Sequence, residues 1–181
     1  MILHALLVSA LGLCFSAFAW AIRCHFRGGQ PVGLGMRAIG ILGLLFVLLH
    51  AAALVMVPVG GWSAAVALGL YALSQGVFWW AIAASRAQRL SLAYSGQHSA
   101  FLLERGPYAR IRHPFYLSYT LFWIAAPVAT GLWFLLVTAV VMAALYAQAA
   151  RAEEKALLAG PLGDAYRNYR ARTAAVIPGV L

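Results

Sequence analysis

The residues with the most capacity for chemistry lie in one short stretch, residues 104–116. It contains three arginines, one histidine and two tyrosines, although only 9% of the chain is charged: Arg105, Arg110, Arg112, His113, Tyr108 and Tyr116. Proline fixes φ and lacks an N–H, so His113-Pro114 predicts a polar connection that gives way to a new helix at Pro114. The N–H groups at such a helix start can bind an anionic ligand. The arginines alone are equally typical of a loop among lipid headgroups.

A second ionisable group follows a later apolar segment. Helical spacing places Tyr146, Glu153 and Glu154 on one face near the end of that segment. After a glycine- and proline-rich break at 160–163, an amphipathic segment, 164–172, is predicted to lie as a helix at the level of the lipid headgroups. It carries three residues at helical spacing: Tyr166, Tyr169 and Arg170.

Composition places these groups in a membrane protein. The chain is 64% hydrophobic with a mean hydropathy of +0.86, whereas soluble domains are roughly 45–50% apolar. Its 181 residues suit one domain. The net charge of +9 is expected to interact with phospholipid headgroups and not with nucleic acid, because nearly all of the sequence consists of apolar segments of bilayer length. Cys14 and Cys24 are too few for a metal site, and no disulfide is expected.

Bilayer-length apolar windows predict the scaffold, an all-α polytopic membrane bundle of about five transmembrane helices. The windows are residues 2–22, 38–57, 63–84, 115–130 and 131–150, the last continuing into water as a helix. The first lacks a basic flank and is long enough to span, so it is interpreted as a retained helix and not a signal peptide. The fourth is short and is predicted to be interrupted at Pro127.

The basic residues predict the topology. All 13 fall in three regions, 23–37, 86–112 and 151–172, and the two remaining connections have none. The positive-inside rule therefore places the N-terminus outside, and the 85–113 loop and the C-terminal tail on the cytoplasmic face. All four acids fall in the same regions, so the reactive groups are expected on one side of the membrane.

The ordered motifs resemble those of the integral-membrane isoprenylcysteine carboxyl methyltransferases and the related phospholipid N-methyltransferases. The matching residues are Gly106-Pro-Tyr108, Arg112-His-Pro-Phe-Tyr116, Glu153-Glu154, Gly163-Asp-Ala-Tyr166-Arg-Asn-Tyr169-Arg-Ala-Arg172 and Ile177-Pro178. The resemblance covers about residues 95–180, whereas residues 1–90 carry no motif. Ser118 stands where many relatives have glycine, and Thr173-Ala174 where many have Val-Pro.

The resemblance implies S-adenosylmethionine as methyl donor, bound in a cytoplasm-facing pocket. The residues that it implies for the cofactor are Ala100, Phe101, Leu102, Leu103, Tyr108, His113, Pro114, Phe115, Tyr116, Glu153 and Glu154. It further implies that Arg172 faces the methyl acceptor. Aromatic faces and carboxylates also suit a sulfonium cation on chemical grounds.

Two acceptor classes stay open, both lipidic. A carboxylate of an isoprenylcysteine-like or isoprenoid acid, the leading hypothesis, would be held by the Arg172 guanidinium in a two-pronged hydrogen bond. An amine, as in an ethanolamine headgroup, would first lose a proton, which His113 or a glutamate could accept. Further candidates for acceptor binding are Tyr166, Tyr169, His50 and Gln75, the last two lying inside predicted spans.

Two functions of other classes are also weighed. A small transporter would need ionisable or polar groups near the bilayer midplane, where only His50 and Gln75 come close. A haem-binding membrane protein would need two histidines at similar depth as axial ligands. The motif series favours the methyltransferase over both.

Overall fold

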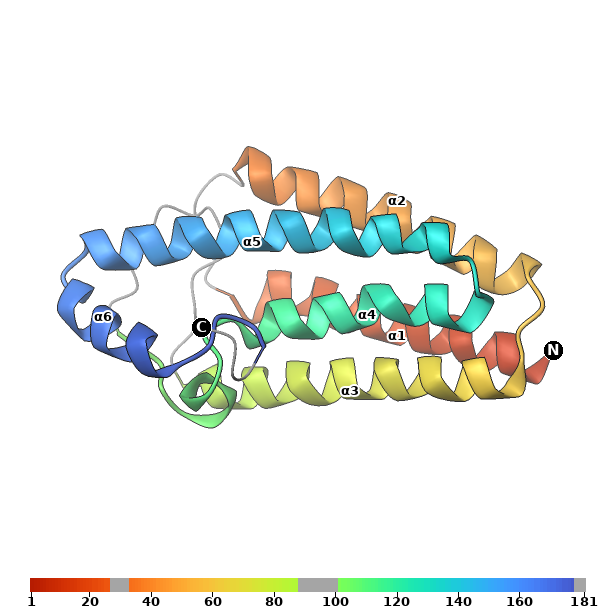
Figure 1. Ribbon diagram of the computed structural model, residues 1–181, viewed down its shortest axis with the longest axis horizontal. Coiled ribbons are helices and arrows are strands. Elements are labelled where there is room, and N and C mark those ends of the chain that lie inside the picture. Colours follow the sequence, from red (N-terminus) through yellow and green to blue (C-terminus); the bar gives the residue numbers. More distant parts are fainter. Residues whose placement is uncertain (27–32, 88–100, 178–181) are drawn as a thin grey trace.

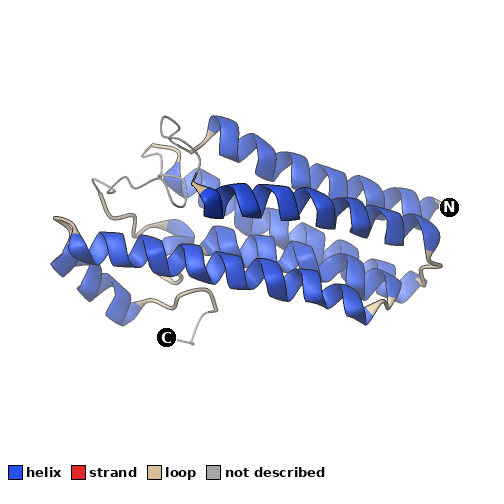
Figure 2. Cartoon of the chain, turned by 90° about the horizontal axis from the view of Figure 1, so that it is seen from above, coloured by secondary structure: helices blue, strands red, loops and turns tan. Residues whose placement is uncertain are grey.

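The computed structural model describes residues 1–26, 33–87 and 101–177, and these form a bundle of five long helices with a shorter helix at one end (Figure 1). The helices are α1 (Ile2–Cys24), α2 (Leu34–Met56), α3 (Gly61–Ser85), α4 (Pro114–Thr130), α5 (Leu136–Ala159) and α6 (Gly163–Arg172), with 3-10 turns η1 (Gly106–Ala109) and η2 (Trp133–Leu135). Within the described residues the only β-type pairing is an isolated bridge between Ile111 and Ala174 (Figure 2). The predicted all-α class is confirmed.

Four helices are long and apolar enough to cross a membrane: α1, α2, α3 and the stretch Trp133–Ala159. Their outward faces carry large exposed apolar side chains, among them Leu13, Ile41, Leu48, Val55, Leu73 and Val140. Such a surface is stable in lipid and costly in water. The chain is therefore an integral membrane protein, as predicted.

The shortest of the long helices, α4, has 17 residues, or about 25 Å at the usual rise per residue. The sequence predicted an interruption at Pro127 within a window that ends near Thr130, but the helix runs unbroken through Pro127 to Thr130. Proline removes only its own N–H from the last turn. The helix then closes because the Gly131 N–H donates to the Pro127 carbonyl over 2.9 Å, with Gly131 at φ +70°.

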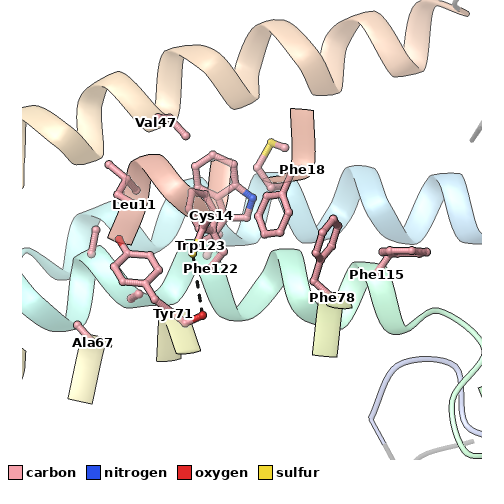
Figure 3. Close-up of a cluster of buried hydrophobic side chains, with 14 of the residues drawn as sticks. Leu11, Cys14, Phe18, Val47, Ala67, Tyr71, Phe78, Phe115, Phe122 and Trp123 are labelled. Atoms are coloured by element: carbon pink, nitrogen blue, oxygen red, sulfur yellow. Dashed lines mark hydrogen bonds between the residues drawn. The ribbon is translucent and has the colours of Figure 1, made fainter. Parts of the chain in front are cut away.

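The core lies where α3 packs along α4, the most extensive interface of the bundle. Small buried residues on both helices let the backbones approach: Ala64, Ala67, Ala125, Ala126 and Ala129. The Ser74 hydroxyl donates to the Ser118 carbonyl over 2.9 Å. From α1, Phe18 inserts its ring edge-on against Phe78 and Phe122, with centroids 5.0 and 5.3 Å away (Figure 3). This cluster joins three helices beneath the candidate site.

Successive helices alternate in direction, so the segments with the predicted motifs meet at one end of the bundle (Figure 1). The end of α3, the turn η1, the start of α4, the end of α5 and the whole of α6 lie there. The antiparallel arrangement of α4 and α5 brings His113 and the Glu153-Glu154 pair together, as the sequence predicted.

The turn η1 fits against α3 through a glycine. Gly106 adopts φ +61°, and a Cβ at this position would lie 2.9 Å from the Ala84 Cβ. The neighbouring Arg105 guanidinium donates to the Ala84 carbonyl over 3.0 Å. Only glycine allows this backbone conformation and this close approach together.

We expect Gly106→Ala to destabilise the protein more than Gly131→Ala. Both positions have positive φ, which alone costs an alanine of order 1 kcal/mol, but a Cβ at Gly131 meets nothing within 4 Å. The Gly106 variant adds a steric clash with α3. Thermal unfolding in detergent would measure the difference, and equal shifts in melting temperature would contradict the close packing of η1.

Candidate active site

The motif loop, residues 101–113, is held by the segment that follows α6. The Ala174 N–H donates to the Arg110 carbonyl over 3.1 Å, and the Ala174 carbonyl accepts from the Arg112 N–H over 2.8 Å. The His113 N–H donates to the Ala175 carbonyl over 3.0 Å. A proline at position 174 could not make the first of these bonds because it has no N–H.

Arg112 ties three segments together from a buried position. Its Nε donates to Glu154 Oε1 over 2.8 Å, and its Nη1 donates to the carbonyls of Arg170, over 3.1 Å, and Thr173. The planar guanidinium is suited to this role because its donors point in fixed directions. The motif loop, α5 and the end of α6 are thus fixed relative to one another.

His113 lies between the two carboxylates of the glutamate pair. Its Nε2 is 3.2 Å from Glu154 Oε1, and its Nδ1 is 3.7 Å from Glu153 Oε2. The Tyr116 hydroxyl donates to Glu153 Oε1 over 2.6 Å. The imidazole and the phenol together orient the Glu153 carboxylate.

The two glutamates differ in surroundings. Glu154 contacts Arg112 and His113, and its Oε2 is 3.5 Å from Arg170 Nε. Because three cationic or potentially cationic groups surround it, its charge is balanced within the protein. Glu153 has one histidine edge and one hydroxyl, which leaves its negative charge less fully compensated. Of the pair, Glu153 is the one positioned to meet a cationic ligand.

Three aromatic rings stack beside this carboxylate. The His113 and Tyr116 rings are 5.4 Å apart at 22°, and the Tyr116 and Tyr146 rings are 5.3 Å apart at 7°. The Trp123 indole N–H donates to the Tyr146 hydroxyl over 3.1 Å and holds the last ring in place. Such faces attract cations and planar rings.

These groups line a cavity of about 780 Å³, within the range of roughly 300–1,000 Å³ typical of small-molecule sites. Its charged end comes from the motif loop and α5. The rest of the wall is largely apolar, and one side of it comes from α1, the residue Phe26 just after it, and α2: Phe15, Phe18, Ala19, Ile22, Phe26, Met36, Ile39, Gly40, Gly43 and Leu44. One cavity thus joins a polar end to an apolar arm.

All but two of the residues predicted to bind the cofactor line this cavity, together with Tyr166 and Tyr169. Ala100 lies outside the described residues, and Glu154 stands behind Glu153 without contributing to the lining. Arg172 is also absent from the lining: its side chain is 61% exposed and pairs with Glu104. Its predicted contact with the acceptor stays a prediction.

The two intramembrane candidates for acceptor binding, His50 and Gln75, also lie outside the lining. The His50 Nε2 is 2.8 Å from the Thr138 Oγ1, a contact that joins α2 to α5, and its ring meets Trp123 edge-on. The Gln75 Oε1 accepts from the Trp79 indole over 3.1 Å. The Trp123 ring that His50 contacts does line the cavity.

The tyrosines of the loop and α6 stay neutral. The Tyr169 hydroxyl donates to the Tyr108 carbonyl over 2.7 Å. Burial raises the pKa of Tyr169 to about 12 and that of Tyr108 well above its ordinary value. The Tyr108 hydroxyl is buried and makes no hydrogen bond within the described residues, although Ser85 lies near. Tyr108 lines the cavity, but its neutral hydroxyl is itself buried.

A helical integral membrane protein with a partly open cavity of small-molecule size, into which charged residues project at one end, is the class that this architecture defines. The family model for phospholipid methyltransferases matches residues 62–164, more than half of the chain, so the chain belongs to that family of integral-membrane methyltransferases. It is therefore a membrane methyltransferase, and the transporter and haem hypotheses are not favoured. No curated protein matches the chain.

Sequence reasoning missed the part of the site contributed by α1 and α2. The signal was present in α1 and just after it, where Phe15, Phe18, Ile22 and Phe26 recur at helical spacing. In so apolar a helix, however, that pattern does not separate a cavity wall from a lipid-facing or core stripe. Arg112 was identified only as a motif arginine, because its partners lie 42 to 61 residues away in sequence.

We expect Arg112→Gln to lower the unfolding free energy by about 3–5 kcal/mol, since it leaves Glu154 buried without its main partner. Arg112→Lys should be intermediate, because it keeps the charge but not the fork of donors. The matched control is Arg167→Gln, whose pair with Asp164 is exposed on both sides and should be worth little. Melting in detergent would test this order; an Arg112→Gln protein as stable as the control would contradict it.

Proposed function

We propose that this membrane methyltransferase uses S-adenosylmethionine to methylate the polar end of an amphiphilic acceptor, with the carboxylate of an isoprenylcysteine-like or isoprenoid acid as the first candidate. The observation that carries the proposal is the single cavity in which Glu153 and the aromatic stack adjoin an apolar arm. A donor and a lipidic acceptor need both kinds of wall within reach of each other.

The lining fits the donor. When bound, S-adenosylmethionine supplies an electrophilic methyl group on a sulfonium sulfur, whose C–S bond breaks as an acceptor oxygen or nitrogen bonds to the methyl carbon. Glu153 would hold the cationic part of the donor, and the rings of Tyr116 and Tyr146 offer it faces. Tyr108 and the segment 101–103 line the same cavity and would contact other parts of the donor.

A carboxylate acceptor needs no general base from the protein. It is already ionised near neutral pH, so the protein has only to orient it and exclude water. The nearest candidate bases, His113 and Glu153, already contact each other. The apolar wall of α1 and α2 would hold the chain of the acceptor beside the donor.

The second candidate is N-methylation of an ethanolamine headgroup, favoured by the phospholipids in the name of the matched family. An amine must lose its proton before it can attack, and Glu153, whose charge is less compensated than that of Glu154, would accept it. Both candidates use the same donor site and the same apolar arm.

We also propose that the site faces the cytoplasm. The described basic residues belong to the end of α1, the start of α2, the end of α3, the loop before α4, the end of α5 and α6, which lie at the end of the bundle that holds the cavity (Figure 1). The connections at the opposite end, near residues 57–60 and 131–132, have none. The positive-inside rule assigns such an end to the cytoplasm.

Donor binding tests the first part of the proposal. Purified protein should bind S-adenosylmethionine and S-adenosylhomocysteine in calorimetry. Glu153→Gln should lower the affinity for the sulfonium ligand, S-adenosylmethionine, by roughly tenfold, which corresponds to about 1.4 kcal/mol. The neutral sulfide should lose less, because the lost interaction is with the positive charge. Glu104→Gln, which removes an acid outside the cavity, is the control. Absence of binding of either ligand to the unaltered protein would refute the proposed donor.

Acceptor length tests the apolar arm. Gly40 lines the cavity, and a Cβ there meets nothing within 4 Å, so Gly40→Leu should fill the arm without straining α2. Methylation of a long-chain acceptor should fall at least tenfold, an effect of about 1.4 kcal/mol, while donor binding and activity on a short-chain analogue persist. The control is Gly69→Leu, an equally unobstructed helical glycine that is absent from the lining. Equal loss in both variants would place the acceptor elsewhere.

A further inference from the structure

We infer that Arg23, in the last turn of α1, binds an anionic group of the acceptor where it lines the cavity. The inference rests on the proposed function and adds to it a recognition residue from the part of the chain without motifs. It concerns binding of the acceptor and not the chemical step. The anionic group is a carboxylate or a phosphate, both of which a guanidinium binds with two parallel hydrogen bonds.

Arg23 belongs to the last turn of α1 and contributes to the lining of the cavity. The same lining includes the apolar residues Ile22 of α1, Phe26 just after α1, and Met36 and Ile39 of α2. The Arg23 side chain is exposed and makes no hydrogen bond or ion pair within the described residues. A cation thus lines the cavity without a partner among the residues that the structure describes.

The other cationic groups of the cavity end are already engaged. The Arg112 guanidinium is taken by Glu154 and by two carbonyls, and His113 lies between the two glutamates. Arg172 pairs with Glu104 outside the lining. Of the described cations that line the cavity, Arg23 is the one left to meet an anion.

The charges of the lining are therefore divided. Glu153, from α5, is the acid of the lining and would meet the positive donor, whereas Arg23 comes from α1. An acceptor that enters with its chain along α1 and α2 would bring its anionic group past Arg23. Opposite charges at separate places in one cavity would orient the donor and the acceptor and would disfavour exchange of their positions.

An arginine at this place also suits two less specific roles. A cation is favourable at the C-terminal end of a helix, and a basic residue at the end of a membrane helix contacts bulk anionic lipid. Both roles would let Arg23 be replaced without a change in preference between an anionic ligand and a neutral ligand of the same shape. That preference is therefore the quantity to measure.

Two ligand pairs measure the preference and separate the two sources of the anion. The first pair is a prenyl-thioether acid and its methyl ester, and the second is phosphatidylethanolamine and its methyl phosphotriester. Dissociation constants would be measured in a neutral detergent, with S-adenosylhomocysteine present, for the unaltered protein and for Arg23→Gln, Arg23→Lys and Arg151→Gln. Arg151 is an exposed arginine of α5 that is absent from the lining.

We expect the unaltered protein and Arg151→Gln to bind the member of one pair that carries the free carboxylate or phosphate at least tenfold more tightly than its esterified partner. Arg23→Gln should lose most of that preference, and Arg23→Lys should keep part of it. Loss of the preference within the first pair would identify the anionic group bound by Arg23 as a carboxylate, and loss within the second pair would identify it as a phosphate. The affinity for S-adenosylhomocysteine should change by less than twofold in all variants.

A preference that survives in Arg23→Gln, or that is lost equally in Arg151→Gln, would overturn the inference. So would the absence of any preference in the unaltered protein. Failure of S-adenosylhomocysteine to bind at all would instead refute the proposed donor, and the ligand pairs, repeated without it, would still report on Arg23.

Discussion

The contact between Arg112 and Glu154 is the constraint on which the site depends, because it joins segments that are distant in sequence at a place where water is largely excluded. Both side chains are mostly buried, with 6% and 13% of their surfaces exposed. Burying two charges is costly, and the cost is offset only when the geometry is good and the remaining donors are satisfied. The carbonyls of Arg170 and Thr173 satisfy those donors. Closure of the C-terminal segment over the loop is thereby coupled to the orientation of the glutamate pair.

The helix bundle supplies the frame in which that contact can form. The tight packing of α3 on α4 sets the direction in which α4 starts, and His113 stands immediately before that start. The stacked rings of Tyr116 and Tyr146 join α4 to α5, and Tyr146 lies about two helical turns before Glu153 on α5. The polar network is thus attached to rigid helices and not only to a loop, which is the condition for a site that orients its ligands.

Much of this arrangement followed from residue types alone. Long apolar runs, prolines and the distribution of arginines predicted the helices, their alternating directions and the end at which the motifs meet, because the bilayer restricts spanning segments to helices of a narrow length range. The resemblance of motifs then predicted residues that line the cavity, such as Tyr108 and Tyr116. Pro127 was misjudged, because one lost hydrogen bond in a last turn does not end a helix.

The remainder depended on packing that an apolar sequence does not encode visibly. Every face of α1 and α2 is hydrophobic, so no periodicity separates the side toward lipid from the side toward the cavity. His50 illustrates the same limit: a polar residue inside a span indicated a cavity wall, but the Thr138 hydroxyl satisfies its Nε2 instead. Whether a polar group meets a ligand or a neighbour is decided by the partner opposite it, which a single chain's residue order does not reveal.

The joining of a charged end and an apolar arm in one cavity has a physical consequence for the kind of reaction the fold can support. A soluble enzyme acting on a lipid must extract its substrate, which exposes the apolar chain during transfer at roughly 0.8 kcal/mol per buried CH₂. Here α1 and α2 are at once membrane-facing helices and the wall of the arm. If the proposed function is right, the chain of an acceptor passes from apolar lipid into an apolar part of the cavity, so little binding energy is lost on transfer. The polar contacts at the charged end then decide which headgroup is accepted.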